Sequence, residues 1–200
     1  MIAAVNDRAW AAVQALGLDE VEVLPLGDGY HEAEFLLFGG DDDDAAYDAL
    51  PGLRAARVVQ TMSAGTDWVE DRVPPWATLC NASGARDAAV AEWVVGALLA
   101  ASYGQLRVAR ERTWDGGWQP QELFGATVLI VGHGSIGRAV ARRLEPFGVH
   151  VVGVASRARG DVHGVGELPA LLPAADAVVV LAPLTDATRG LIGGRSTRTH

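Results

Sequence analysis

The chain has 200 residues and a mass of 21.0 kDa, and its 50% hydrophobic content is enough to form a buried core. All 16 basic residues are arginine and stand against 25 acidic residues, so the formal net charge is -9. Without a basic stripe, this charge argues against nucleic-acid binding. The single cysteine, Cys80, excludes an internal disulfide, and no paired His or Cys spacing predicts a metal site.

Residues 1–10 lack the features of a secretory signal, because Asn6 and Asp7 interrupt the apolar run that such a signal needs. The most apolar segment, Val90–Tyr103, contains Glu92 and is shorter than the roughly 18 residues that span a bilayer. We therefore expect a cytoplasmic protein without membrane contact.

Residues 1–87 alternate between short apolar runs and amphipathic segments. This alternation indicates a parallel α/β layer. The acidic run Asp41–Asp44 is interpreted as the solvated start of a helix, because four adjacent carboxylates do not point at one metal ion. The predicted strands are Ile2–Val5, Val21–Leu24, Glu34–Phe38, Arg57–Met62 and Ala77–Cys80, and a helix is predicted at Arg8–Leu16.

A long apolar helix is predicted from Ala88 to about Arg110, with a length of roughly 35 Å. Gly96 and Gly104 each weaken it by about 1 kcal/mol relative to alanine, which is tolerated where another backbone approaches closely. A domain linker or a subunit contact explains both glycines. The segment Trp114–Pro120 is expected to form a loop, and a second α/β unit starts at Gly125.

A Gly-x-Gly-x-x-Gly motif lies between a predicted buried strand, Ala126–Val131, and a predicted helix, Arg138–Phe147. Gly148 and a second predicted strand, His150–Val154, follow. Strand, glycine turn, helix and strand form the full context of a dinucleotide-binding fingerprint.

Each glycine of this fingerprint has a separate expected role. Gly132 permits the tight turn, Gly134 lets the backbone approach a pyrophosphate, and Gly137 lets the helix pack closely on the strand. Amides at the helix start, at Ser135 and Ile136, would hold the phosphates together with the helix dipole.

The end of the second strand predicts the cofactor. NAD-selective enzymes usually carry Asp or Glu there, which binds the ribose hydroxyls, but this position falls near Ala155. Ser156, Arg157 and Arg159 follow and supply a hydroxyl and cations for a ribose 2'-phosphate. We expect a preference for NADP, with NAD possible as a second cofactor, while ordinary exposed arginines are the alternative.

Four separated segments together are more specific than the glycines alone, and in them the sequence resembles the D-isomer-specific 2-hydroxyacid dehydrogenases. The resemblance covers nearly the whole chain, to about Ile192. The segments are Gln60–Asp67, Asn81 to Glu92, Gly132 to Gly148, and Leu168–Ile192 with Pro183-Leu184-Thr185 and Thr188.

The resemblance implies an α/β fold with a flavodoxin-like substrate domain at residues 1–87. An incomplete, doubly wound Rossmann-type domain would follow at residues 125–200. Residues 88–124 would form an interdomain and dimer helix with its connecting loop. The implied partners are a small 2-oxo or 2-hydroxy acid and a second copy of the chain.

The resemblance also implies site residues. The backbone amides of Ser63, Ala64 and Gly65 would hold a substrate carboxylate, although a plain structural turn is the alternative. Pro183 and Thr188 would flank the cofactor.

The histidines are interpreted separately. His133 occupies a variable position of a phosphate turn and is expected to neighbour the cofactor rather than act as a general acid. His31 and His163 have no motif around them and are expected at the surface.

Family chemistry needs an Arg that polarises the 2-oxo acid, a His that exchanges the proton and a Glu that orients the His. The sequence departs from the family pattern at about Gly193, and Arg195 and His200 do not match the catalytic pair. We therefore expect a truncated or frameshifted chain without these residues. The strand Ala126–Val131 would lie mid-sheet with one edge lacking a neighbour, which predicts a marginal or aggregation-prone domain.

The sequence leaves two other functions open. One is a catalytically silent protein that binds a nucleotide or dimerises. The other is a methyltransferase with a similar glycine turn, which the absent acidic residue after the second strand and the Ser63-Ala64-Gly65 loop argue against.

These expectations predict weak NADPH binding by the 200-residue chain, tighter than NADH binding, and no detectable reduction of glyoxylate, hydroxypyruvate or pyruvate. Losing general acid-base help alone lowers a rate by about 10² to 10⁴. Fluorescence titration and an absorbance assay measure both quantities. Robust turnover, or tighter binding of NADH, would contradict the interpretation.

Overall fold

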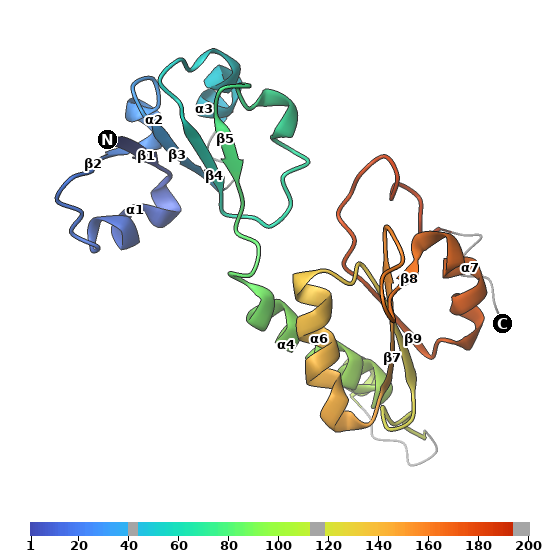
Figure 1. Ribbon diagram of the computed structural model, residues 1–200. Coiled ribbons are helices and arrows are strands. Elements are labelled where there is room, and N and C mark those ends of the chain that lie inside the picture. The colour runs from blue at the N-terminus through green and yellow to red at the C-terminus, as the bar shows by residue number, and fades with distance from the viewer. Residues whose placement is uncertain (40–43, 113–118, 194–200) are drawn as a thin grey trace. The chain divides into compact units, whose positions relative to one another are not determined.

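The computed structural model describes residues 1–39, 44–112 and 119–193, and the chain divides into two compact units, Met1–Ser83 and Gly84–His200 (Figure 1). Each unit is built around one parallel sheet, as the alternating pattern predicts. Asp41–Asp43 and most of the expected 114–120 loop lie outside the described residues. The functional division at residues 87 and 124 stays a prediction.

The first unit contains a five-stranded sheet in the order β2-β1-β3-β4-β5, with all neighbours parallel. This order is the flavodoxin-like one, which confirms the predicted fold class of this unit. The strands begin and end within one residue of the predicted ranges. They are β1 (Ile2–Val5), β2 (Glu22–Pro25), β3 (Phe35–Phe38), β4 (Val58–Thr61) and β5 (Thr78–Cys80).

Three helices connect these strands: α1 (Asp7–Gln14), α2 (Leu26–Gly29) and α3 (Asp44–Ala49). The Asn6 side chain caps α1, because its oxygen accepts a 3.2 Å hydrogen bond from the Ala9 amide. A core row of small and branched side chains, Ala4, Leu36 and Val59, runs in register across β1, β3 and β4 and packs with Leu26 and Ala46 of the helices.

The second unit contains a four-stranded parallel sheet in the order β8-β7-β6-β9. This is the order of the first four strands of a Rossmann sheet, which confirms the predicted fold class. The strands are β6 (Thr127–Val131), β7 (His150–Ala155), β8 (His163–Gly164) and β9 (Ala177–Val180).

One expectation for this sheet is wrong: β6 does not lack a neighbour. It lies between β7 and β9 and pairs with both, because the chain crosses over and returns to the other side of β6. In the described residues the edge strands are β8 and β9, and the Val178 and Val180 side chains of β9 are exposed. The expected tendency to aggregate stays a prediction.

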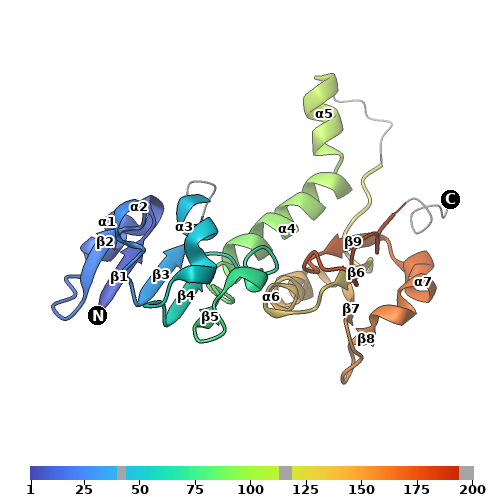
Figure 2. The same ribbon diagram turned by 90° about the horizontal axis from the view of Figure 1, so that it is seen from above.

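Helices cover both faces of the second sheet, with α6 (Ser135–Leu144) on one side and α7 (Leu168–Leu171) on the other (Figure 2). Ile130 of β6 packs with Val140 and Leu144 of α6, while Leu129 and Val131 pack with Leu168. Short helical turns lie at Leu50–Gly52, Glu70–Arg72, Glu145–Phe147, Val165–Glu167 and Leu172–Ala174.

The long helix expected from Ala88 to about Arg110 is also wrong as a continuous element. It is two helices, α4 (Asp87–Ser102) and α5 (Gln105–Glu111), bent by 63° at the break. Gly104 adopts a left-handed conformation with φ 57°, which ends α4 and which glycine adopts without strain. Within the second unit no atom lies within 4 Å of a Cβ built on Gly96, so the expected close backbone approach is absent there.

The helices α4 and α5 are the most apolar helical segment among the described residues. Among the described residues no single helix is long and apolar enough to cross a membrane, and α4 with α5 meets that length and composition only when the bent pair is counted together. Ala91 and Val94 of α4 are buried in the core that α6 shares.

Candidate functional site

The glycine turn after β6 is fixed by hydrogen bonds to the neighbouring strand. The amides of Gly132 and His133 both donate to the Val154 carbonyl of β7, each at 2.9 Å. The Gly134 amide donates to the Gly132 carbonyl at 2.8 Å. These bonds hold the turn at the carboxyl end of the sheet, where ligands bind in open parallel α/β sheets.

Two of the three glycines are required by packing. Gly132 has φ 101°, and a Cβ placed there would lie 2.5 Å from the Ala182 nitrogen of the segment after β9. A Cβ on Gly137 would lie 2.7 Å from the Gly132 carbonyl oxygen. Any larger residue would force apart backbone segments that touch.

Gly134 differs from the other two, because a Cβ placed there meets no atom within 4 Å. It precedes α6 without a side chain that could cap the helix. The first amides of a helix have no preceding helical carbonyl to bond, and they carry the positive end of its dipole. Open space in front of such amides suits the close approach of an anion such as a pyrophosphate.

The segment after β7 carries the predicted residues Ser156 and Arg157, which are both exposed. Arg159 was expected to be a free cation available to the 2'-phosphate. Instead, its guanidinium donates a 2.8 Å hydrogen bond to the His133 carbonyl. Its backbone also pairs with Val162. Arg159 therefore joins the segment after β7 to the glycine turn.

The His133 ring packs on β7, where a Cβ on Gly153 would lie 2.9 Å from the ring. Burial, followed by the charges of Arg138 and Arg159, lowers the pKa of His133 below 6.5, and Asp161 opposes this shift. The ring is therefore neutral near pH 7. Its proposed place beside the cofactor stays a prediction.

His31 and His163 lie outside the glycine turn. His31 is exposed, and its ring lies 4.0 Å from that of Tyr30. His163 is partly exposed and bonds Glu167 through Nδ1 at 2.8 Å. Hydrogen bonds from His163 and from the Gly164 amide lower the pKa of Glu167.

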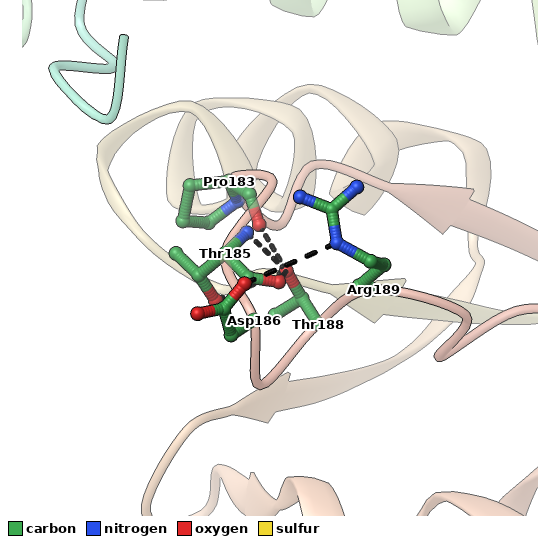
Figure 3. A network of polar contacts seen from close by, with 5 residues as sticks. All are labelled: Pro183, Thr185, Asp186, Thr188 and Arg189. Carbon is green, nitrogen blue, oxygen red and sulfur yellow. Dashed lines mark hydrogen bonds and ion pairs between the residues drawn. The ribbon is translucent and has the colours of Figure 1, made fainter. Parts of the chain in front are cut away.

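The loop after β9 contains the predicted residues Pro183 and Thr188 (Figure 3). The Thr188 hydroxyl donates to the Pro183 carbonyl and accepts a 2.8 Å bond from the Thr185 amide. The Thr188 amide returns a bond to the Thr185 carbonyl at 3.0 Å. Thr188 thus closes the loop, and the loop begins next to Gly132 at the carboxyl end of β6 and β9.

The predicted substrate loop, Ser63 to Gly65, follows β4 in the first unit. All three of its carbonyls are bonded: Ser63 O to the Ala82 amide at 3.0 Å, Ala64 O to Asn81 Nδ2 at 3.2 Å, and Gly65 O to the Ser63 hydroxyl at 2.7 Å. The buried Thr61 hydroxyl adds a second bond to Ser63 O at 2.9 Å. Each carbonyl is therefore satisfied inside the protein.

The amides of the same loop are in the opposite situation. Among the described residues, no acceptor bonds the amides of Ser63, Ala64 or Gly65. Consecutive amides of this kind in a turn form a concave site for an anion. The sequence alone could not show which groups of this loop are bonded, because the donors to its carbonyls, Asn81 and Ala82, lie 17 or more positions further along the chain.

Comparison with known proteins decides the family. Residues 96–198 match the model of the D-isomer specific 2-hydroxyacid dehydrogenase NAD binding domain. The chain belongs to the D-isomer specific 2-hydroxyacid dehydrogenase family. A glyoxylate reductase of Thermofilum pendens is 34% identical over 169 residues, which are 75% of this chain and 48% of that protein. The chain spans about half the length of the curated relatives it matches.

Solved structures of the family show the same fold. A family member from Aeromonas salmonicida is 26% identical with a TM-score of 0.73, and the match covers 94% of this chain and 64% of that one. A Xanthobacter autotrophicus dehydrogenase, solved with NADPH and MES, is 23% identical with a TM-score of 0.75 and coverage of 96% and 67%. The predicted family membership and fold are confirmed.

Replacing Gly132 by alanine is expected to lower the free energy of unfolding of the second unit by about 3 kcal/mol, because the positive φ and the contact with Ala182 both oppose a Cβ. Gly134→Ala is the matched control and should change this free energy by less than about 1 kcal/mol. Urea unfolding followed by circular dichroism measures both. Equal effects of the two substitutions would contradict the division of roles.

The lowered pKa of His133 predicts a pH dependence of stability. The unfolded chain takes up a proton at this histidine as the pH falls below about 6.5, whereas the folded chain resists protonation until lower pH. Stability should therefore fall as the pH drops below 6.5, and His133 should contribute no pH dependence above that value. His133→Gln should flatten the dependence, while His150→Gln, at an exposed strand position, is the control. Urea midpoints between pH 5 and 8 test this, and an unchanged slope in His133→Gln would refute it.

Proposed function

We propose that this chain contributes the cofactor turn and the substrate loop of an NAD(P)-dependent dehydrogenase that interconverts 2-oxo and 2-hydroxy acids. The supporting observation is the open space at Gly134, between two glycines that packing requires, in a chain of this family. That space is what a bound pyrophosphate needs. A nicotinamide nucleotide supplies the hydride when bound, and this chain's residues would hold the nucleotide and the acid.

The proposed substrate is a small 2-oxo acid such as glyoxylate, held by its carboxylate. The unbonded amides of Ser63, Ala64 and Gly65 support this assignment, as does the name of the Thermofilum pendens relative, a glyoxylate reductase. Carboxylate oxygens accept such bonds more strongly than neutral acceptors do. The loop has little side-chain bulk, so its backbone is accessible.

The proposed cofactor preference is for NADP, with NAD as the weaker alternative. Ser156 and Arg157 are exposed directly after β7, and Ala155 stands where an NAD-selective enzyme usually has a carboxylate. The structural neighbour from Xanthobacter autotrophicus was solved with NADPH. Arg157 would pair with the 2'-phosphate, and Arg159 would keep the segment attached to the glycine turn.

A homodimer formed through residues 88–103 is proposed as the assembly, in the cytoplasm. On α4 the Trp93 side chain is 73% exposed, although the helix is strongly apolar. Large apolar side chains in such a position mark interaction surfaces.

The cofactor turn is tested by enlarging Gly134, where space is open. Gly134→Val should leave the second unit folded but weaken NADPH binding at least about tenfold, because the side chain occupies the space of the pyrophosphate. Calorimetric titration of NADPH measures the affinity, and circular dichroism checks the fold. Unchanged NADPH affinity in a folded Gly134→Val variant would remove the proposed function.

Cofactor choice is tested separately. Arg157→Gln should weaken NADPH binding about tenfold through the lost charge-assisted bonds and leave NADH binding unchanged. Arg142→Gln, exposed in the last turn of α6, is the matched control and should change neither affinity. If Arg157→Gln and Arg142→Gln bind both cofactors alike, the 2'-phosphate assignment is wrong.

A further inference from the structure

The Trp68 side chain contacts the Ser63 to Gly65 loop. Its indole Nε1 donates to the Ser63 hydroxyl oxygen and to the Gly65 carbonyl oxygen, at 3.2 Å each. The Ser63 hydroxyl itself donates to the same Gly65 carbonyl at 2.7 Å. One N–H group therefore bonds both ends of the Ser63 to Gly65 loop.

Trp68 is in turn held by a separate element of the first unit. The Tyr47 hydroxyl, from α3, donates a 2.7 Å bond to the Trp68 carbonyl, and the two rings stack with centroids 6.0 Å apart. The Arg72 guanidinium lies 4.4 Å from the Tyr47 ring centroid and bonds Asp48 of α3 at 3.1 Å. The indole is thus fixed from the side of α3 rather than by the loop alone.

The planar peptide links the direction of each bonded carbonyl in the loop to the direction of the next amide. In a planar trans peptide the carbonyl and the following N–H point in opposite directions. Ala82 and Asn81 bond the carbonyls of Ser63 and Ala64. The amides that follow these carbonyls therefore point to the opposite side, away from Ala82 and Asn81. By the same geometry, the bond from Trp68 to the Gly65 carbonyl orients the amide of Thr66, which has no acceptor among the described residues.

We propose that Trp68 is a positioning residue for the carboxylate-binding loop, an inference that rests on the proposed function. Its indole N–H holds the Gly65 carbonyl, which turns the Thr66 amide toward the carboxylate of a 2-oxo acid, and its bond to the Ser63 hydroxyl ties this end of the loop to the other. The Ala64 and Gly65 amides are presented beside it by the carbonyl bonds to Ala82 and Asn81. The loop is ordered before the acid arrives, so the acid does not have to order it.

Trp68→Phe tests the indole N–H in the full chain, because phenylalanine keeps a ring for the Tyr47 stack and removes the donor. Trp76→Phe is the control: Trp76 is also partly exposed in the first unit, where it contacts Arg54 at 5.1 Å. In ¹⁵N NMR, the order parameters of the loop amides should fall from about 0.85 in the wild type to below about 0.6 in Trp68→Phe. Titrated glyoxylate should bind about tenfold more weakly. Trp76→Phe should match wild type in both measurements.

The two readouts separate the inference from the function on which it rests. If glyoxylate shifts none of the loop amides in the wild type, the proposed carboxylate site fails, while loop order without ligand still tests Trp68. If Trp68→Phe equals Trp76→Phe in loop order, the inference is overturned. A third measurement needs no variant: the wild-type Trp68 indole proton should exchange with solvent more slowly than that of Trp76, and equal rates would overturn the inference even where Trp68→Phe fails to fold.

Discussion

The contact between two backbones at Gly132 sets the geometry of the second unit. β6 and β9 are parallel neighbours, so the chain segments that follow them leave the sheet at the same end and lie against each other. They fit only because the residue after β6 has no side chain and a positive φ. The direction of the turn, the start of α6 and the beginning of the Pro183 loop all follow from that meeting point.

Both candidate sites offer an anion backbone groups rather than a pair of cations. At the glycine turn the groups are the first amides of α6, and at the loop after β4 they are amides whose carbonyls are bonded elsewhere. This arrangement suits a chain of net charge -9, because oriented amides create a local positive potential without adding a formal charge. Of the groups assigned to ligands, only Arg157, proposed for the 2'-phosphate, carries a formal charge.

The sequence was sufficient to predict what depends on local pattern. The strands β1 to β7 lie within one residue of their predicted ranges, because period and flanking turn residues mark buried strands clearly, whereas the short β8 and the bounds of β9 were not predicted. The helix break escaped prediction because Gly104 sits in an uninterrupted helical pattern, and only its left-handed φ reveals the bend. The pairing of β6 on both sides was missed because strand order depends on the crossover and not on any single segment.

Contacts between distant residues account for the rest of what was missed. The bond of Asn81 to Ala64 joins residues 17 positions apart, and that of Arg159 to His133 joins residues 26 apart. No periodicity encodes such pairs. Asn81 belonged to a segment that resembles the family, which was the one available signal, whereas Trp68 gave none beyond its position next to the loop.

The bond from Arg159 to the His133 carbonyl has a consequence for redesigning cofactor choice. The two arginines of the segment after β7 have different roles. Arg157 is exposed to solvent, whereas Arg159 anchors the segment to the glycine turn. Grafting an acidic segment from an NAD-selective relative as a block would remove the anchor along with the solvent-facing cation. A redesign that alters Ser156 and Arg157 but retains Arg159 would change the groups proposed to face the ribose and leave the bond that anchors the segment to the turn intact.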